Sequence, residues 1–180
     1  VHVESSMMLP VEFARIARRH GTVGAVCDPH EIANVLGASG VILMLDNARE
    51  TDFHFGFGAP SCVPSCSADV ETSAEVLDSK AVASLLERED IAMLSEMMNY
   101  PGVLGGDASV MAKIEAARRV GKPVDGHAPG LVGEGRRRYA SAGISTDHEC
   151  TRYEEARDAV ASGMKVLIRE GSAAKNYEAL

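Results

Sequence analysis

Long hydrophobic runs are missing from this sequence of 180 residues. No stretch approaches the roughly 18 consecutive apolar residues that a membrane-spanning helix needs. No signal peptide opens the chain, which begins with Val1 rather than methionine. We therefore expect no membrane partner, and the cytoplasm is the expected location.

Cysteine is also scarce. The four cysteines are too few and too scattered to staple a secreted domain with disulfides, so we expect reduced thiols. They are Cys27, Cys62, Cys66 and Cys150. Cys62 and Cys66 have the spacing of half a zinc site, but a second pair is missing, which disfavours zinc binding there.

Basic charge is outweighed by acidic charge, with 18 lysines and arginines against 26 aspartates and glutamates and a net charge of −8. An acidic chain without a concentrated basic face is a poor partner for nucleic acid, because phosphates repel it. We interpret the one basic run, at residues 136–138, as the solvated face of a helix. The composition indicates one soluble globular unit that is long enough to bury a core.

Short apolar runs alternate with amphipathic stretches along the whole sequence. Strands are expected at 1–3, 22–27, 53–58, 91–94, 123–124, 144–148 and 165–168, and helices at 10–19, 32–49, 72–89, 108–120, 131–142 and 153–162. This alternation is typical of parallel strands joined by crossover helices. It predicts an α/β fold, a (β/α)8 TIM-type barrel of about 250 residues, of which this chain covers about strands 1 to 7. The alternative is an open doubly wound sheet, but the Gly-x-Gly-x-x-Gly turn of such sheets is missing after the first strand.

The run from Phe53 to Gly58 alternates phenylalanine with smaller or polar residues. Because side chains alternate along a strand, the three phenylalanines share one side. We expect that side to face the helices and the glycines to face the crowded barrel interior.

Histidines and carboxylates stand directly after several of the expected strands. They occur in the stretches 1–4, 95–99, 125–130 and 147–150. Barrels of this kind collect their chemistry from the ends of successive strands, and imidazole and carboxylate groups suit borderline and hard divalent metals. The pattern predicts a metal site at the C-terminal mouth of the barrel. His20, near a helix end, and His54, at a strand start, are not expected to be ligands.

Each of these residues also has a purely structural interpretation. His2 alone could be a surface histidine, Glu96 an exposed loop carboxylate and His127 a loop residue. On a regular strand Asp147 and Glu149 point away from His148, so only one set can face a metal. We favour His148 as the ligand, with its two neighbours supporting the ligands or contacting substrate.

Seven stretches carry a family resemblance. They are residues 2–6, 28–35, 59–64, 96–103, 124–130, 147–150 and 168–176. Together they resemble the bacterial and archaeal adenine deaminases, a branch of the amidohydrolase superfamily. The sequence departs from the family pattern at Cys66 and at residues 132–135, both in loops.

The resemblance implies a metal-dependent (β/α)8 barrel that hydrolyses adenine, a small-molecule substrate, to hypoxanthine and ammonia. It implies two divalent metal ions, iron or manganese with zinc as an alternative, and a homo-oligomer. His2 would be the second histidine of a His-x-His pair, Glu96 the carboxylate that bridges the metals, and His127 and His148 the ligands from strands five and six.

Further roles follow from the residue types and their positions after strands. Glu31 and Glu149 are candidates for contacts to purine nitrogens. For His30 we leave two roles open, a substrate contact or proton relay and a structural hydrogen bond. The first histidine of the pair would lie two positions before His2, and the strand-eight aspartate would lie after Leu180. Residues 1–180 are therefore expected to be a partial catalytic barrel domain whose flanking parts are absent.

Two other functions stay open. One is a different amidohydrolase reaction on the same metals, such as hydrolysis of a cyclic amide. The other is a non-catalytic barrel remnant that binds no metal pair.

Overall fold

Within each of two sheets, every strand pairs in parallel with the strand that follows it in the sequence. The computed structural model describes residues 1–66 and 70–180. The strands are β1 (Gly24–Cys27), β2 (His54–Pro60), β3 (Ile91–Met97), β4 (Val124–Gly126), β5 (Thr146–Asp147) and β6 (Lys165–Val166). The helices are α1 (Pro10–Ala17), α2 (His30–Leu36), α3 (Ala38–Ala48), α4 (Ser79–Leu86), α5 (Tyr100–Gly105), α6 (Ala108–Arg119), α7 (Gly133–Ser141) and α8 (Tyr153–Ala161), with 3-10 turns η1 (Glu4–Ser6) and η2 (Arg18–His20).

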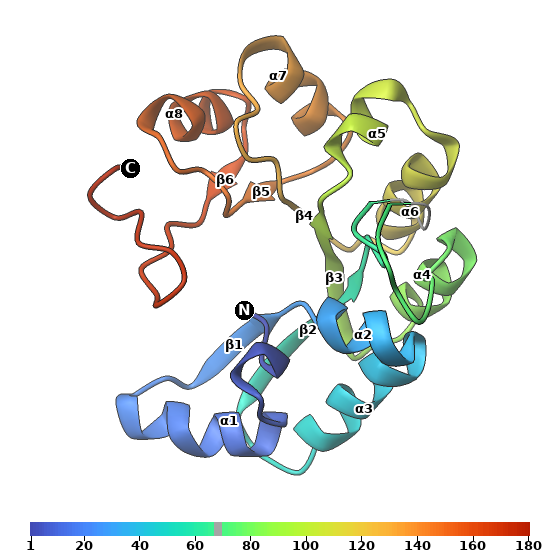
Figure 1. The fold of residues 1–180 in the computed structure, drawn as a ribbon, viewed down its shortest axis with the longest axis vertical. Coiled ribbons are helices and arrows are strands. Elements are labelled where there is room, and N and C mark those ends of the chain that lie inside the picture. The colour runs from blue at the N-terminus through green and yellow to red at the C-terminus, as the bar shows by residue number, and fades with distance from the viewer. Residues whose placement is uncertain (67–69) are drawn as a thin grey trace.

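The order of the strands distinguishes a barrel wall from an open sheet. One sheet has the order β1-β2-β3-β4, a second pairs β5 with β6, and a parallel bridge between Val124 and Ile144 connects them. A doubly wound sheet reverses its order at a switch point, whereas a barrel wall runs on in sequence order. The chain curls into an open arc with strands inside and helices outside (Figure 1), which confirms the partial (β/α) barrel.

Several expected elements differ from the prediction, among them the helix expected to end at residue 49, which Gly37 divides into α2 and α3. The expected first strand, residues 1–3, is not a strand: Val1 pairs with β1 through two backbone hydrogen bonds, and Val3 already has helical dihedral angles at the start of η1. The helix expected at 72–89 begins only at Ser79, because the Asp78 side chain accepts hydrogen bonds from the backbone N–H groups of residues 80 and 81 and so caps it.

The alternation in β2 is confirmed. The rings of Phe53 and Phe55 each lie 6.2 Å from the ring of Phe13 on α1, so the aromatic side faces a helix. On the other side, a Cβ at Gly58 would come within 2.6 Å of the Ser95 side chain on β3. Only glycine fits there, because no real Cβ atom tolerates such a contact.

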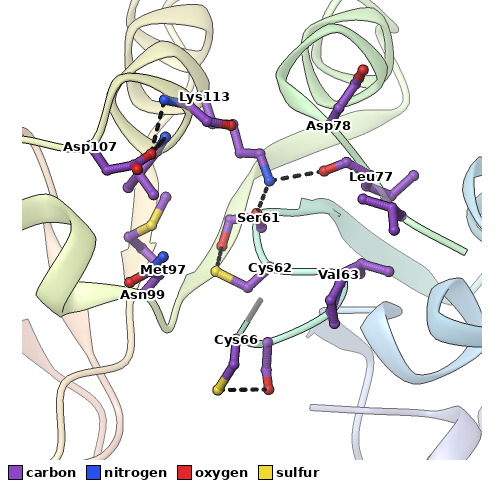
Figure 2. A pocket seen from close by; sticks show the side chains of 15 residues that line it. Ser61, Cys62, Val63, Cys66, Leu77, Asp78, Met97, Asn99, Asp107 and Lys113 are labelled. Carbon is purple, nitrogen blue, oxygen red and sulfur yellow. Dashed lines mark hydrogen bonds between the residues drawn. The ribbon is translucent and has the colours of Figure 1, made fainter. Parts of the chain in front are cut away.

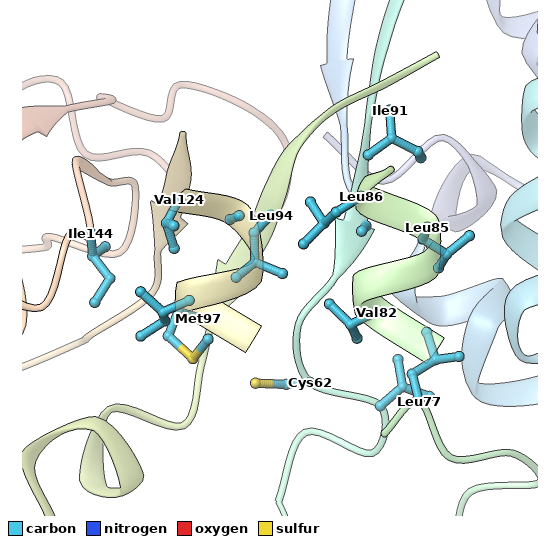
Figure 3. Close-up of a cluster of buried hydrophobic side chains, with 14 of the residues drawn as sticks. Cys62, Leu77, Val82, Leu85, Leu86, Ile91, Leu94, Met97, Val124 and Ile144 are labelled. Carbon is cyan, nitrogen blue, oxygen red and sulfur yellow. The ribbon is translucent and has the colours of Figure 1, made fainter. Parts of the chain in front are cut away.

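The apolar core lies between the strands and the outer helices. Figure 3 shows Val82, Leu85 and Leu86 of α4 near Leu94 of β3, with Val124 beyond. Full burial of such a side chain contributes about 1.5–3 kcal/mol each. This packing fixes the strands whose ends carry the site. In the described ranges, no helix has both the length and the apolar character needed to cross a bilayer.

Candidate metal centre

Glu96 lies where β3 becomes irregular. The register of β3 against β4 shifts between Leu94 and Met97, and Glu96 has a left-handed φ of 29°. Such a backbone costs a residue other than glycine roughly 1–3 kcal/mol and persists only where the surroundings enforce it. Here the Ser61 hydroxyl donates a hydrogen bond of 2.5 Å to the Glu96 carbonyl, and the N–H of Met98 donates another of 2.7 Å.

Three histidines converge on the buried Glu96 carboxylate. Its Oε1 lies 3.0 Å from Nε2 of His2 and 3.2 Å from Nε2 of His148. Its Oε2 lies 3.2 Å from Nδ1 of His127. The sequence predicted these four side chains to meet at one mouth, and the structure brings them together.

Glu96 belongs to two groups of potential metal ligands at once. One consists of His2, Asp28, His30 and Glu96, and the other of Glu96, His127 and His148; within each group the ligand atoms lie within 4.8 Å of one another. A carboxylate shared by two ligand groups is the arrangement that a pair of cations about 3.5–4 Å apart requires.

The His2 group is ordered by Asp28. Nδ1 of His2 donates a 2.8 Å hydrogen bond to the Asp28 carbonyl, which leaves Nε2 facing Glu96. The Asp28 carboxylate lies 2.8 Å from Nδ1 of His30 and accepts a 2.7 Å hydrogen bond from the Ser95 hydroxyl. A ligand histidine is characteristically fixed in this way, by a bond from its other ring nitrogen.

The second group is held from strands β4 and β5. Nδ1 of His148 lies 3.5 Å from the Asp125 carboxylate, and Nε2 faces Glu96. Nδ1 of His127 is buried and lies 3.2 Å from Oε2 of Glu96, but no hydrogen bond with a described residue satisfies it. An unpaired buried nitrogen is costly, and a cation at this position would satisfy it. The donor set therefore fits divalent cations.

In the metal-free site, the carboxylates and the imidazoles stabilise each other's charged forms. Hydrogen bonding to Glu96 raises the pKa of His2 to about 9. Burial lowers the pKa of His148, but the carboxylates of Asp125 and Glu96 outweigh it and raise this pKa to about 10. Burial likewise opposes ionisation of Glu96, yet the three imidazoles hold its pKa well below the ordinary range. A cation bound here takes the place of those imidazole protons.

Comparison with known proteins places this site in a family. The model described as "Amidohydrolase family" matches residues 1–174. The chain belongs to the amidohydrolase family. Curated relatives of this amidohydrolase include proteins named adenine deaminase from Salinibacter ruber, Parabacteroides distasonis and Methanosarcina mazei, which are 59%, 56% and 54% identical to it. Each match covers all 180 residues, and the chain spans about a third of the length of these relatives.

Glu149 lies on a different side of the amidohydrolase site from the one the sequence predicted. Because β5 ends at Asp147, strand alternation does not continue to Glu149, whose Oε1 lies 3.8 Å from Nε2 of His148 and 3.9 Å from Nδ1 of His127. Nη2 of Arg169 donates a 3.1 Å hydrogen bond to its other oxygen. Asp147 alone turns away, into an ion pair with Arg136.

The prediction that residues 136–138 form a solvated face is wrong for Arg136. Its side chain is fully buried, because its guanidinium pairs with Asp147 and bonds backbone carbonyls. Composition could not reveal this, since the partner lies on a different element.

Other candidate residues lie apart from the two ligand groups. Glu31 is exposed, and its carboxylate accepts a 2.6 Å hydrogen bond from the Ser5 hydroxyl. His20 and His54 are exposed and belong to neither group, as the sequence predicted. The sequence analysis assigned no role to Asp28 and Asp125, which orient ligand histidines. The signal that could have found them is that each directly follows an expected strand.

A cavity of about 280 Å³ lies beside the centre, between the ends of β2 and β3 and helices α4 and α6. In Figure 2 the Lys113 amine reaches the loop after β2, where it donates hydrogen bonds of 2.7 Å to the Ser61 carbonyl and 2.9 Å to the Leu77 carbonyl. Burial lowers the pKa of Lys113. None of the lining residues belongs to the ligand groups, and Lys113 acts on the centre only through Ser61, whose hydroxyl bonds the Glu96 carbonyl.

Proposed function

We propose that the protein hydrolyses adenine to hypoxanthine and ammonia at two divalent cations held around Glu96. The observation that carries the proposal is the shared carboxylate, Glu96, between two groups of imidazole ligands. The substrate is inferred from the relatives named adenine deaminase. Manganese or iron is the proposed metal, with zinc as the alternative.

In this proposal His2 holds one cation, His127 and His148 hold the other, and Glu96 lies between them. A pair of divalent cations lowers the pKa of a water molecule and so supplies a nucleophile at neutral pH. The burial of Glu96 supports this assignment, because the electrostatic attraction between carboxylate and cation grows as water is excluded.

Glu149 is the proposed substrate contact. Arg169 fixes its carboxylate through a two-pronged contact, and its Oε1 lies within 4 Å of both His127 and His148. A carboxylate held beside the ligands can accept or return a proton at a purine nitrogen.

His30 is the proposed proton relay. Asp28 orients it through Nδ1, and its ring lies 4.6 Å from the ring of His2. Its Nε2 is thereby left to exchange a proton with substrate or water. Glu31 stays a candidate substrate contact, from an exposed position outside the ligand groups.

The test measures ammonia release from adenine by the complete protein. Activity should vanish after chelation and return on addition of Mn²⁺ or Fe²⁺. Undiminished release after thorough chelation contradicts a metal-dependent reaction. Turnover of a cyclic amide without turnover of adenine favours the other amidohydrolase reaction, and absence of bound metal favours the non-catalytic remnant.

Three further expectations remain predictions. Residues 1–180 form part of one catalytic barrel domain, the protein assembles as a homo-oligomer without nucleic acid, and it acts in the cytoplasm. Light scattering of the purified protein tests the assembly state.

A further inference from the structure

Helix α7 directs two polar side chains into the molecule. Arg136 and Tyr139 are three residues apart, which places them on the same face of a helix. Both are fully buried. Neither contacts the metal ligands through a ligand atom, so the site as described does not use them.

The Tyr139 hydroxyl joins the ends of two ligand-bearing strands. It donates a hydrogen bond of 2.7 Å to the carbonyl of Met97, the residue after Glu96. It accepts one of 3.0 Å from the backbone N–H of His127. One buried oxygen atom therefore fixes the backbone at Glu96 relative to the backbone at His127.

The Arg136 guanidinium links the loop after His127 to the end of β5. Nη2 donates a 3.1 Å hydrogen bond to the carbonyl of Ala128, and Nε donates one of 3.0 Å to the carbonyl of Leu131. Nη1 pairs with the carboxylate of Asp147, the residue before His148. Arg136 thus grips the loop after His127 and the end of β5 together.

β4 and β5 pack so closely that no side chain fits at Gly126. A Cβ at Gly126 would lie 2.3 Å from the Thr146 carbonyl and 3.1 Å from a ring carbon of Tyr139. The ring of Tyr139 therefore packs against the strand that leads into His127. His2, by contrast, takes its orientation from the Asp28 carbonyl, and no hydrogen bond links it to α7.

We propose that Tyr139 and Arg136 are positioning residues: through them α7 sets the geometry of Glu96, His127 and His148 and hence the affinity of the cation these three bind. The cation on the His2 side depends on them only through the shared Glu96. The inference rests on the proposed function only in requiring that the site binds cations. It assigns α7 a role in one half of the centre.

The test uses Tyr139→Phe, which keeps the ring and removes the hydroxyl. The matched control is Tyr153→Phe, at an exposed tyrosine on α8. Mn²⁺ binding to the metal-free complete protein is followed by equilibrium dialysis, and coupling within the metal pair by electron paramagnetic resonance. Loss of a residue that supports a metal ligand lowers metal affinity roughly 10- to 100-fold.

We expect Tyr139→Phe to weaken one Mn²⁺ by at least about tenfold, to weaken the other much less and to reduce the signal of the coupled pair. Equal weakening of both ions would indicate general loosening of the fold and would overturn the inference, as would unchanged binding of both. If Tyr139→Phe does not yield folded protein, Arg136→Lys, which keeps the charge but loses the planar fork, is judged by the same criteria. Because no adenine is present, the outcome does not depend on which reaction the centre catalyses.

Discussion

The two halves of the metal centre are built in different ways. His2 lies in a segment without regular structure, which the backbone of Val1 ties to the edge of β1. His127 and His148 follow strands in the wall and are held from behind by buried side chains of α7. The second half is therefore organised by the core, whereas the first depends on pairing at the end of the sheet. Among the residues that the structure describes, Glu96 is the one that both ligand groups share.

The largest effect is expected for Glu96→Gln, because this residue is shared by both ligand groups and its replacement weakens both cation sites. The amide keeps the size but loses the negative charge that offsets two cations, so metal content should fall from two towards one or none. Elemental analysis of the complete protein measures this. Glu87→Gln, at an exposed glutamate, should leave the content unchanged. Two metals per chain in Glu96→Gln would refute the bridging role.

Single histidine replacements sharpen the comparison. His148→Asn should remove the cation of the α7 half, and His2→Asn the cation of the other half, because each takes one neutral imidazole ligand away. Each variant should retain about one metal per chain. His54→Asn, at an exposed histidine outside both groups, is the control. Loss of both metals from either variant would show that the halves are not independent.

The dependence on pH follows from the two raised histidine pKa values. Since the pKa values of His2 and His148, about 9 and about 10, exceed the unfolded value of 6.5, their protons stabilise the folded metal-free protein. That contribution is complete below about pH 6.5 and is lost as the pH rises through 9 to 10. Glu96 has the opposite sign, because its lowered pKa gives stability that is lost on acidification.

Denaturant titrations in chelator across this range should therefore show falling stability of the metal-free protein above neutral pH. Mn²⁺ affinity should rise over the same range, because binding displaces protons. Stability that stays level up to about pH 10 would contradict the raised pKa values.

The smallest effect is expected for Arg169→Lys. Lysine keeps the charge but cannot form the two-pronged contact with Glu149, so adenine turnover should fall about tenfold while both metals stay bound. Steady-state rates and elemental analysis on the same sample check both parts. A loss of metal would mean that Glu149 acts as a ligand and not as a substrate contact.

A metal site at the strand ends could be predicted because barrel chemistry lies there and the strands were visible as apolar runs, whereas His2 was predicted as a ligand through the family resemblance. What surrounds the ligands could not be predicted. Arg136 looked solvated because its partner, Asp147, lies on a different element. The orientation of Glu149 was mispredicted because the strand ends at Asp147, two residues before it. Residues 72–78 read as helix, yet backbone bonds to Asn34 and Val63 hold them in an irregular path. These are tertiary contacts, which override local pattern.

The left-handed backbone of Glu96 has a consequence for protein engineering. Glycine or asparagine adopts that conformation more readily than glutamate, so a library selected only for thermal resistance should drift toward those residues at this position. A library selected for bound metal should return glutamate. Selection for thermal stability and selection for metal binding would thus favour different residues at position 96.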